Sequence, residues 1–430
     1  MSSEVGSIPL RELSSRITKG TTPTKGEGFV DCGINYIKSE SLSADGSIDA
    51  SKFAFIDEET HNKLSRSQLR AGNVLFSMAG VYLGKTAVVL SKHLPANTNQ
   101  AVGIVTLDES KADPYFIHYS LQSPACRAWI LRSAAQSAQP NFNLQEIGDL
   151  KIPAFPLAQQ KEIASVLRIL DDRITLLRET NTTLEAIAQA LFKSWFVDFD
   201  PVHAKMEGRI PEGMDENTAR LFPDELEESE LGLVPKGWRA KPLDTIASFL
   251  NGLALQKFPP TGQDDLPIIK IAQLRKGDSV GADQAARSIK PEYIVQNGDV
   301  LFSWSGSLEV EIWCGGEGAL NQHLFKVTSD EFPKWFYFLW TRHHLADFRQ
   351  TAASKATTMG HIQRGHLTTA KVCIPSVAVL EVATSVIGPT IEMIIENSLQ
   401  AQTLVTLRDT LLPSLISGQF RLPEINAEVA

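Results

Sequence analysis

The stretch GNVLFS, from Gly72 to Ser77, decides how this sequence is interpreted, because it recurs as GDVLFS from Gly298 to Ser303. Further matching pairs flank it in the same order, and the offset between the partners shrinks steadily along the chain. They are Gly20/Gly252, Lys38/Lys270, Leu42/Leu274, Asn99/Asn321, Gln100/Gln322, Phe142/Ile362, Leu167/Ile387, Ile174/Ile394, Leu184/Leu404 and Leu191/Leu411. Chance matches would not keep their order, whereas a duplication followed by small loop deletions does. The sequence therefore predicts one structural unit that is present twice.

Each copy begins with a part that mixes strand and helix signals. Short runs such as KTAVVL and AVGIVTL are rich in β-branched residues and are bounded by Gly, Pro, Asn and Ser, which is typical of strands. PYFIHYSLQSPACRAWIL and PKWFYFLWTRHHLADFR are long enough for helices. We expect two α+β domains, at residues 1–153 and 238–375.

A long helix is expected after each domain, at residues 154–200 and 376–418. Apolar residues alternate four and three positions apart between Ile163 and Trp195, interrupted once by Asn181, and a single polar residue in such a heptad seam fixes register. The second seam is less regular, and Gly388-Pro389 predicts a kink or a late helix start there. The two helices pack on each other, or else each packs only on its own domain.

Acidic residues concentrate between the copies. Residues 211–231 hold eight acids and one base, a net charge of −7, so the rest of the chain carries only −2 of the total of −9. A near-neutral remainder permits a DNA-binding cleft without predicting one. We expect residues 201–237 to form a solvated acidic linker that lies away from any DNA, and residues 419–430 to form a tail.

Composition places the chain among soluble proteins. The sequence is 43% hydrophobic and 21% charged, it has no stretch of about 20 apolar residues, and its start does not resemble a signal peptide. The four cysteines lie far apart, without CxxC or His at metal-ligand spacing, so we expect neither disulfides nor zinc. A cytoplasmic protein without a membrane segment is predicted.

Three stretches resemble a known family. They are ITKGTTPT at residues 17–24, LFKSWFVDFDPVHAK at residues 191–205 and GLVPKGWR at residues 232–239. Together with the order GNVLFS, NTNQAV and IPAFPLAQQKEIA in the first copy, they look like conserved parts of the specificity (S) subunits of Type I restriction-modification enzymes. The resemblance covers nearly the whole chain, although the second copy has LALQ where the first has TTPT.

The resemblance implies a function and a set of partners. Each globular part would be a target-recognition domain, and the two helices would form an antiparallel coiled coil that separates these domains. The chain would bind double-stranded DNA, two modification (methyltransferase) subunits and restriction (translocase/nuclease) subunits. It would have no catalytic residues and no cofactor or metal, because S-adenosylmethionine, ATP and Mg²⁺ would be held by the partner subunits.

The sequence motifs offer little support for nucleotide binding, catalysis or metal binding. Gly80 and Gly84 enclose three residues where a phosphate-binding GxxxxGK[ST] loop needs four. Pro140 to Phe142 falls short of an amino-methyltransferase motif, and the adjacent His343 and His344 point to different faces of a helix. Two alternatives remain: a self-contained DNA methyltransferase or nuclease, and a coiled-coil adaptor that binds no specific DNA.

Candidate DNA-reading residues share amide, cationic or aromatic side chains in predicted loops, because Asn and Gln suit adenine whereas Arg and Lys suit guanine or phosphate. In the first domain they are Lys19, Thr21, Thr22, Lys38, Tyr82, Lys85, Asn99, Gln100, Gln139 and Asn141. In the second they are Lys270, Trp304, Gln322, His323, Lys355, Thr358, His361 and Arg364.

An aromatic cluster at the end of the first long helix is the candidate partner-binding surface. It consists of Phe192, Trp195, Phe196 and Phe199. Buried aromatic side chains are the usual anchors of protein contacts, so an exposed cluster predicts docking of the modification subunits. The alternative is that these rings belong to the chain's own core.

Overall fold

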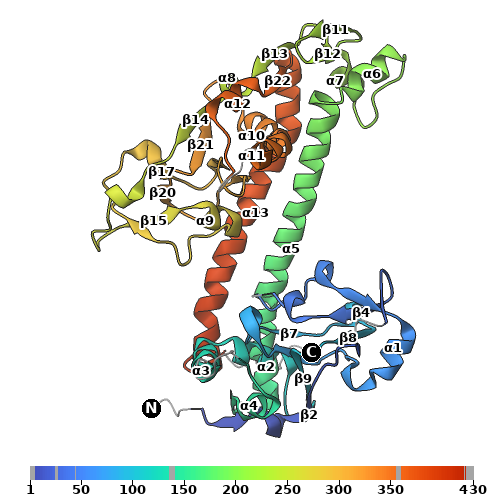
Figure 1. The fold of residues 1–430 in the computed structure, drawn as a ribbon, viewed down its shortest axis with the longest axis vertical. Helices are drawn as coiled ribbons and strands as arrows, with labels where there is room; N and C mark the ends of the chain where they lie inside the picture. Colours follow the sequence, from blue (N-terminus) through green and yellow to red (C-terminus); the bar gives the residue numbers. More distant parts are fainter. Residues whose placement is uncertain are drawn as a thin grey trace, which may run out of the picture. The chain divides into compact units, whose positions relative to one another are not determined.

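The computed structural model describes residues 5–24, 28–43, 45–134, 141–354, 360–420 and 422. The chain divides into two compact units: Met1–Arg173 with Leu404–Ala430, and Ile174–Thr403. The division runs through both long helices, so each unit contains one globular part and a stretch of each helix. Figure 1 shows the elements of each unit.

The first unit is built on two four-stranded sheets and one strand pair. The first sheet has the order β2 (Ser14–Lys19), β9 (Val102–Leu107), β6 (Val74–Ser77), β7 (Thr86–Val88). The second has the order β3 (Phe29–Val30), β5 (Ala54–Ile56), β4 (Ile34–Ile37), β8 (Ala96–Thr98), and β1 (Ser7–Pro9) pairs with β10 (Lys151–Pro153). Its short helices are α1 (Glu58–Lys63), α2 (Pro114–Gln122), α3 (Pro124–Ala134) and α4 (Leu144–Asp149).

The second unit repeats this arrangement. Its first sheet has the order β14 (Ser248–Asn251), β21 (Leu324–Thr328), β18 (Val300–Ser303), β19 (Val310–Ile312). Its second has the order β16 (Gln284–Ala285), β15 (Leu266–Ile269), β20 (Gly318–Leu320), β17 (Ile294–Val295), and β13 (Arg239–Pro242) pairs with β22 (Lys371–Ile374). Its short helices are α8 (Leu243–Ile246), α9 (Ile271–Lys276), α10 (Lys334–His343), α11 (Leu345–Ser354) and α12 (Arg364–Thr369). The predicted α+β class and internal repeat are confirmed.

The repeated stretch forms the same turn and strand in both units. Gly72 and Gly298 have φ angles of 84° and 88°, a left-handed conformation that side chains with a Cβ rarely adopt. The next residue, Asn73 or Asp299, accepts a hydrogen bond of 2.8 Å from the backbone N–H three residues upstream. Every residue of β6 and β18 that follows is buried. The motif therefore specifies a tight turn into a central core strand.

The long helices α5 (Leu157–Phe196) and α13 (Val377–Ser417) contact each other within each unit, running in opposite directions. In the first unit, Arg408 of α13 donates to Asp171 of α5 at 2.8 Å. In the second, Ile174 and Leu177 of α5 are buried, as the seam predicts. The antiparallel pairing is confirmed, and the alternative that each helix packs only on its own domain is wrong.

The side chain of Asn181, the polar interruption of the seam, bonds to the opposite helix. Its Nδ2 donates to the carbonyl of Ile394 and to Ser398 Oγ, both at 2.9 Å, and its Oδ1 accepts from Asn397 Nδ2 at 2.9 Å. A shift of one helix along the other would leave these half-buried groups unpaired, which costs about 1–3 kcal/mol for each group. Asn181 therefore fixes the register of the two helices.

The expected late start of the second helix at Gly388-Pro389 is wrong, because α13 is helical throughout Val377–Ser417. Pro389 has no N–H, so the carbonyl of Ser385 lacks its usual helical donor. Both residues are exposed, and water can therefore donate to that carbonyl. Ile387 and Ile391 on either side are buried in the core of the second unit. Packing on both sides of the proline outweighs its intrinsic cost of about 3 kcal/mol.

The acidic segment is folded rather than a simple connection. It contains α6 (Asp200–Met206), α7 (Glu216–Leu221) and a hairpin of β11 (Leu226–Ser229) and β12 (Gly232–Pro235). Val202, Phe222 and Val234 are buried in the core of the second unit, whereas all eight acids are exposed. The acids are solvated as expected, but the backbone that carries them packs on the domain.

One helix among the described residues, α13, is long and apolar enough to cross a membrane by length and composition. A core helix passes the same test. Ala383, Ile387 and Ile391 of α13 lie in the core of the second unit, and Leu412, Leu415 and Ile416 lie in that of the first. A helix that supplies apolar residues to two cores has this composition without a membrane.

Candidate nucleic-acid interface

The predicted residues of the second unit gather around Trp304, which follows β18. The ring centroids of His323 and His361 lie 5.9 and 6.3 Å from that of Trp304. Trp304 Nε1 donates to Asn251 Oδ1 at 2.9 Å, and Ser305 Oγ lies 3.0 Å from His323 Nδ1. Three loops distant in sequence thus present one polar and aromatic surface.

Two further predicted residues border this surface. Gln322 Nε2 lies 3.4 Å from His323 Nε2, and the Gln322 side chain is half-buried. Arg364, the first residue of α12, is exposed, and its guanidinium carbon lies 6.0 Å from the centroid of the Phe325 ring. The exposed guanidinium and the half-buried amide are the donor types used on base edges and phosphates.

A glycine in each unit brings the strand end against the Asn-Gln turn. A Cβ on Gly20 would lie 2.1 Å from the carbonyl oxygen of Thr98, and one on Gly252 would lie 2.2 Å from that of Asn321. Only glycine permits this approach. In the first unit it leaves Gln100 exposed, and Asn99 Oδ1 has no hydrogen-bond partner within the described part of the chain.

The loop after the central strand contacts the same segment in both units. Ala79 forms an isolated bridge with Asn141, and Ser305 forms the equivalent bridge with His361. The N–H of Phe142 donates to the carbonyl of Met78 at 2.8 Å, and the N–H of Ile362 donates to that of Trp304 at 3.0 Å. The two units therefore hold different side chains on the same loop backbone.

The first-unit loop is open to solvent. Gly80 would accommodate a Cβ without a neighbour inside 4 Å, and Lys85 Nζ lies 4.9 Å above the Tyr82 ring. Asn141 is exposed beside this loop. The loop therefore offers a cation, a ring and an amide together, as the sequence predicts for a DNA-contacting loop.

The remaining predicted residues are less uniform. Lys38 is paired with Glu40 at 2.7 Å and Lys270 with Asp283, so a phosphate would have to displace a carboxylate at either position. Lys19 and Thr22 are exposed near the end of β2, and Thr21 is half-buried. Gln139, Lys355 and Thr358 lie outside the described residues.

Sequence reasoning missed Asn251 and Ser305, which orient the Trp304 indole and the His323 imidazole. The repeat could have identified Asn251, because the alignment that pairs the two turn glycines also pairs it with Lys19, which the sequence analysis does include. Nothing in the sequence marks Ser305, whose counterpart is Ala79.

Comparison with known proteins gives the family. The family model "Type I restriction modification DNA specificity domain" matches residues 3–186. The MjaIX specificity subunit of Methanocaldococcus jannaschii is 25% identical over 79% of this chain and 76% of its own length. The HindI specificity subunit of Haemophilus influenzae is 24% identical over 65% of this chain and 71% of its own.

The chain is similar to the specificity subunits of Type I restriction-modification enzymes. A crystal structure of the Type I S subunit from M. genitalium aligns with 95% of each chain at a TM-score of 0.55 and 14% identity, which is a likeness of fold. This similarity accounts for the two globular parts as target-recognition domains and for a role in DNA-sequence specificity.

The family is that of a non-catalytic subunit. Among the described residues, no group of three or more His, Cys, Asp or Glu could hold a metal ion. Burial lowers the pKa values of His343 and His344, and the His344 ring contacts the carbonyl of Lys371 at 2.9 Å. These adjacent histidines therefore serve packing within the second target-recognition domain.

The prediction that the aromatic cluster is an exposed partner surface is wrong. Phe192, Trp195 and Phe196 are at most 8% exposed, and Phe199 is half-buried against Trp238. Trp335, Trp340 and Phe222 of the same unit surround them, with ring centroids 5.0 to 5.6 Å away. The apolar face that the sequence left unpartnered is covered by the domain that follows it in the chain.

Proposed function

We propose that each target-recognition domain reads one half of a bipartite double-stranded DNA target, so that two unlike short sequences flank an unread gap. The supporting observation is that equivalent loop positions hold different side chains on the same backbone hydrogen bonds, as Met78 and Trp304 do. Side chains at such loops determine which base edges are read, whereas the backbone determines where the loop lies.

In this proposal the two domains read DNA with different chemistry. The first presents Gln100, Asn141 and Lys85, which are suited to adenine edges and phosphates. The second presents Trp304, His323 and Arg364, where an aromatic plane and a guanidinium offer contact to a thymine methyl or a guanine. The half-sites would therefore differ, and the target would not be a palindrome.

The proposal extends to the complex. Two modification subunits, one for each half of the repeat, would carry S-adenosylmethionine and methylate adenine, and restriction subunits would use ATP and Mg²⁺ to translocate and cut. This chain would hold no cofactor of its own and would act in the cytoplasm. Its contribution is to position both recognition domains, with Asn181 fixing the helix register on which their spacing depends.

The decisive experiment exchanges one recognition domain. Residues 252–375 are replaced by the equivalent part of a family member of different specificity, and DNA modified by the co-expressed complex is mapped for methylated adenine. We expect one half-site to change while the other half-site and the gap stay the same. The matched control exchanges the first domain and should change the other half-site.

Three outcomes would contradict the proposal. A continuous target, a change in both half-sites, or DNA modification by this chain alone would each be inconsistent with two independent readers on a non-catalytic subunit. A preserved gap length, in contrast, would support a spacing that is set by the helices.

A further inference from the structure

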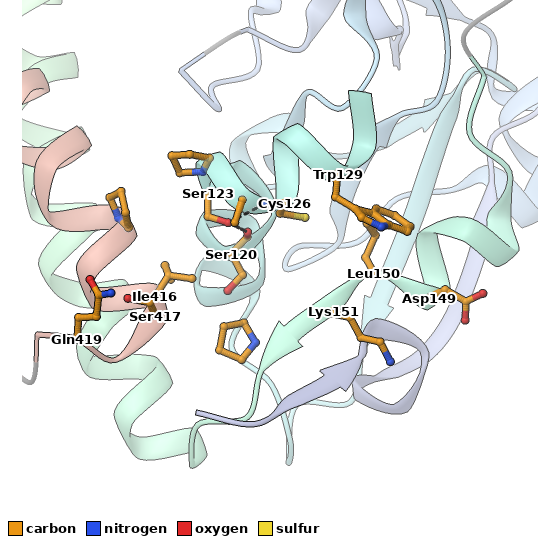
Figure 2. A pocket seen from close by; sticks show the side chains of 14 residues that line it. Ser120, Ser123, Cys126, Trp129, Asp149, Leu150, Lys151, Ile416, Ser417 and Gln419 are labelled. Atoms are coloured by element: carbon orange, nitrogen blue, oxygen red, sulfur yellow. Dashed lines mark hydrogen bonds between the residues drawn. The ribbon is translucent and has the colours of Figure 1, made fainter. Parts of the chain in front are cut away.

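A groove of about 620 Å³ opens in the first unit between the end of α13 and the helices α2 and α3. Figure 2 shows Ile416 and Ser417 of α13 on one side and Trp129, Leu150 and Lys151 on the other. Its walls are mainly apolar. The volume falls within the range of about 300–1,000 Å³ that is typical of ligand pockets.

A buried hydroxyl lines this groove. Ser120 is 2% exposed, and its Oγ has no hydrogen-bond partner within the described part of the chain. In Figure 2 the Ser120 side chain lies between those of Ile416 and Leu150. An unpaired buried hydroxyl costs about 1–3 kcal/mol, and this one has almost no surface that a group in the groove could reach.

The internal repeat shows what fills the equivalent space in the second unit. The downstream alignment of the two copies pairs Phe116 of α2 with Phe336 of α10, both fully buried, and therefore pairs Ser120 with Trp340. The Trp340 indole is buried against Phe192, with ring centroids 5.0 Å apart. The second unit thus inserts its own indole where the first has a hydroxymethyl group.

The helix ends differ in the same way. In the same alignment, Phe192, Phe196 and Phe199 of the second unit correspond to Leu412, Ile416 and Gln419 of the first. Gln419 and Ile416 line the groove, whereas Phe196 and Phe199 pack against Trp238. Four positions that are aromatic in the second unit are therefore small, aliphatic or polar in the first.

The described end of the chain does not fill the groove. Phe420 and Leu422 instead line a separate hollow with Val5 and Phe155. A single ring would leave most of the space empty, since a cavity of about 150 Å³ already holds benzene. DNA is a poor occupant of the groove because the walls are mainly apolar. Lys151 is the one cationic side chain among the lining residues, and the lining also contains the carboxylate of Asp149.

We propose that this groove receives a protein segment that inserts a Trp, Tyr or Phe side chain beside Ser120, donated by one of the two modification subunits. The inference rests on the proposed function, because it assigns the partner to that complex. The inserted ring takes the place that Trp340 occupies in the second unit. The docking surface is then restricted to the first half of the repeat.

The test fills the groove from within. In Ser120→Trp the chain supplies its own indole, as the second unit does, whereas Leu131→Trp adds the same ring to α3 at an exposed position outside the groove. Each variant is co-expressed with the modification subunit and the complex is weighed by native mass spectrometry. We expect Ser120→Trp to weaken one docking event about 30-fold, as for a hot-spot residue, and to leave one modification subunit bound. Leu131→Trp keeps two.

A second measurement uses the unaltered complex. Cys126 lines the groove, and Cys32 is an exposed thiol elsewhere in the first unit. Burial raises the pKa of Cys126 to about 11, so its alkylation is slow and is followed over time by mass spectrometry. We expect the complex to slow alkylation of Cys126 at least about fivefold relative to the free chain while Cys32 reacts at the same rate.

The outcomes separate this inference from the proposed function. Unchanged stoichiometry in Ser120→Trp, or equal Cys126 reactivity with and without the partner, overturns the groove as a docking site even if the complex still methylates a bipartite target. If Ser120→Trp fails to fold, the Cys126 measurement alone decides. A wild-type chain that assembles with no modification subunit overturns the proposed function and this inference together.

Discussion

Where a domain helix meets the end of a long helix, the first unit has Ser120 and Leu412, whereas the second has Trp340 and Phe192. The first sheet has the equivalent strand order in both units, and the glycine turns that lead into β6 and β18 are the same. The two copies therefore share the residues that the backbone conformation requires, such as the turn glycines. They differ at positions where the side chain only fills space. Each unit is a natural control for the other.

The largest expected effect comes from reversing this difference at Trp340. Trp340→Ser removes an indole that is 3% exposed and leaves a cavity next to Phe192, so we expect about 3–5 kcal/mol less stability in the second unit. Denaturant unfolding followed by Trp fluorescence measures it. Ser120→Ala in the first unit is the control and should change stability by less than about 1 kcal/mol, because its hydroxyl makes no hydrogen bond within the described residues. Equal losses would show that the two sites are packed alike.

A half-buried acid distinguishes the two units at Glu311, which takes the place of the fully buried Ala87. Burial raises the pKa of Glu311 to about 7, an effect that the nearby Arg342 and Arg349 reduce and that Glu185 and Glu309 add to. Because the folded pKa lies above the unfolded one, the protonated form stabilises the second unit below pH 4.5, and that stability is lost as the pH rises to about 7.

Glu311→Gln should therefore stabilise the second unit at pH 8 by up to about 3 kcal/mol, and by little at pH 4. Unfolding midpoints at both pH values measure the difference. The control, Ala87→Gln, places the same amide in the first unit without relieving any charge and should destabilise it at both pH values. A Glu311→Gln effect that is independent of pH would contradict the assignment.

A smaller effect is expected at the glycine of the Asn-Gln turn. Gly252→Ala places a Cβ 2.2 Å from the carbonyl oxygen of Asn321, so the turn must move, at a cost of about 1–3 kcal/mol. Recognition of one half-site should weaken, as measured by DNA binding to targets altered in each half. Gly365→Ala is the matched control: its Cβ would meet nothing within 4 Å, and it replaces a helical glycine of α12. That control should be neutral or slightly stabilising.

The smallest effect is expected in the acidic hairpin, which has no counterpart among the described strands of the first unit. Neutralising Glu227, Glu228 and Glu230 removes exposed carboxylates, of which Glu230 pairs with Lys371 at 2.9 Å. Exposed pairs contribute at most about 1 kcal/mol, so both stability and the preferred DNA target should stay nearly the same. Binding measured over a range of salt concentrations checks this. A changed target would indicate that the hairpin lies against DNA.

Much of the fold follows from the sequence because the repeat and the seam report local rules. The positive φ of Gly72 and Gly298 and the hydrogen bonds of Asn181 each depend on a single residue within a repeated pattern. Such a residue can be recognised in the sequence. The bounds of α13 could not be predicted in this way. A proline normally ends a helix unless the packing of its buried neighbours compensates for its cost. Ile387 and Ile391 supply that packing only once the domain has folded.

The candidate interface was predictable in part. Trp304, His323 and His361, which are candidates from the sequence, lie together in the structure. Lys38 and Lys270 pair with carboxylates that no motif reveals. The aromatic cluster was assigned to a partner because a heptad stripe looks the same whether its neighbour is another chain or a later domain. Only the tertiary contacts of Phe192 and Phe196 distinguish these cases.

The division of the chain has a consequence for synthesis. The second unit is a continuous run from Ile174 to Thr403, but the first combines the start of the chain with Leu404–Ala430. A ribosome adds about 5–20 residues each second and releases the N-terminal part first. The first unit therefore waits for its last helical turns, where Leu412, Leu415 and Ile416 enter its core, until the whole second unit has been synthesised. Of the two units, the one whose synthesis begins earlier is completed later.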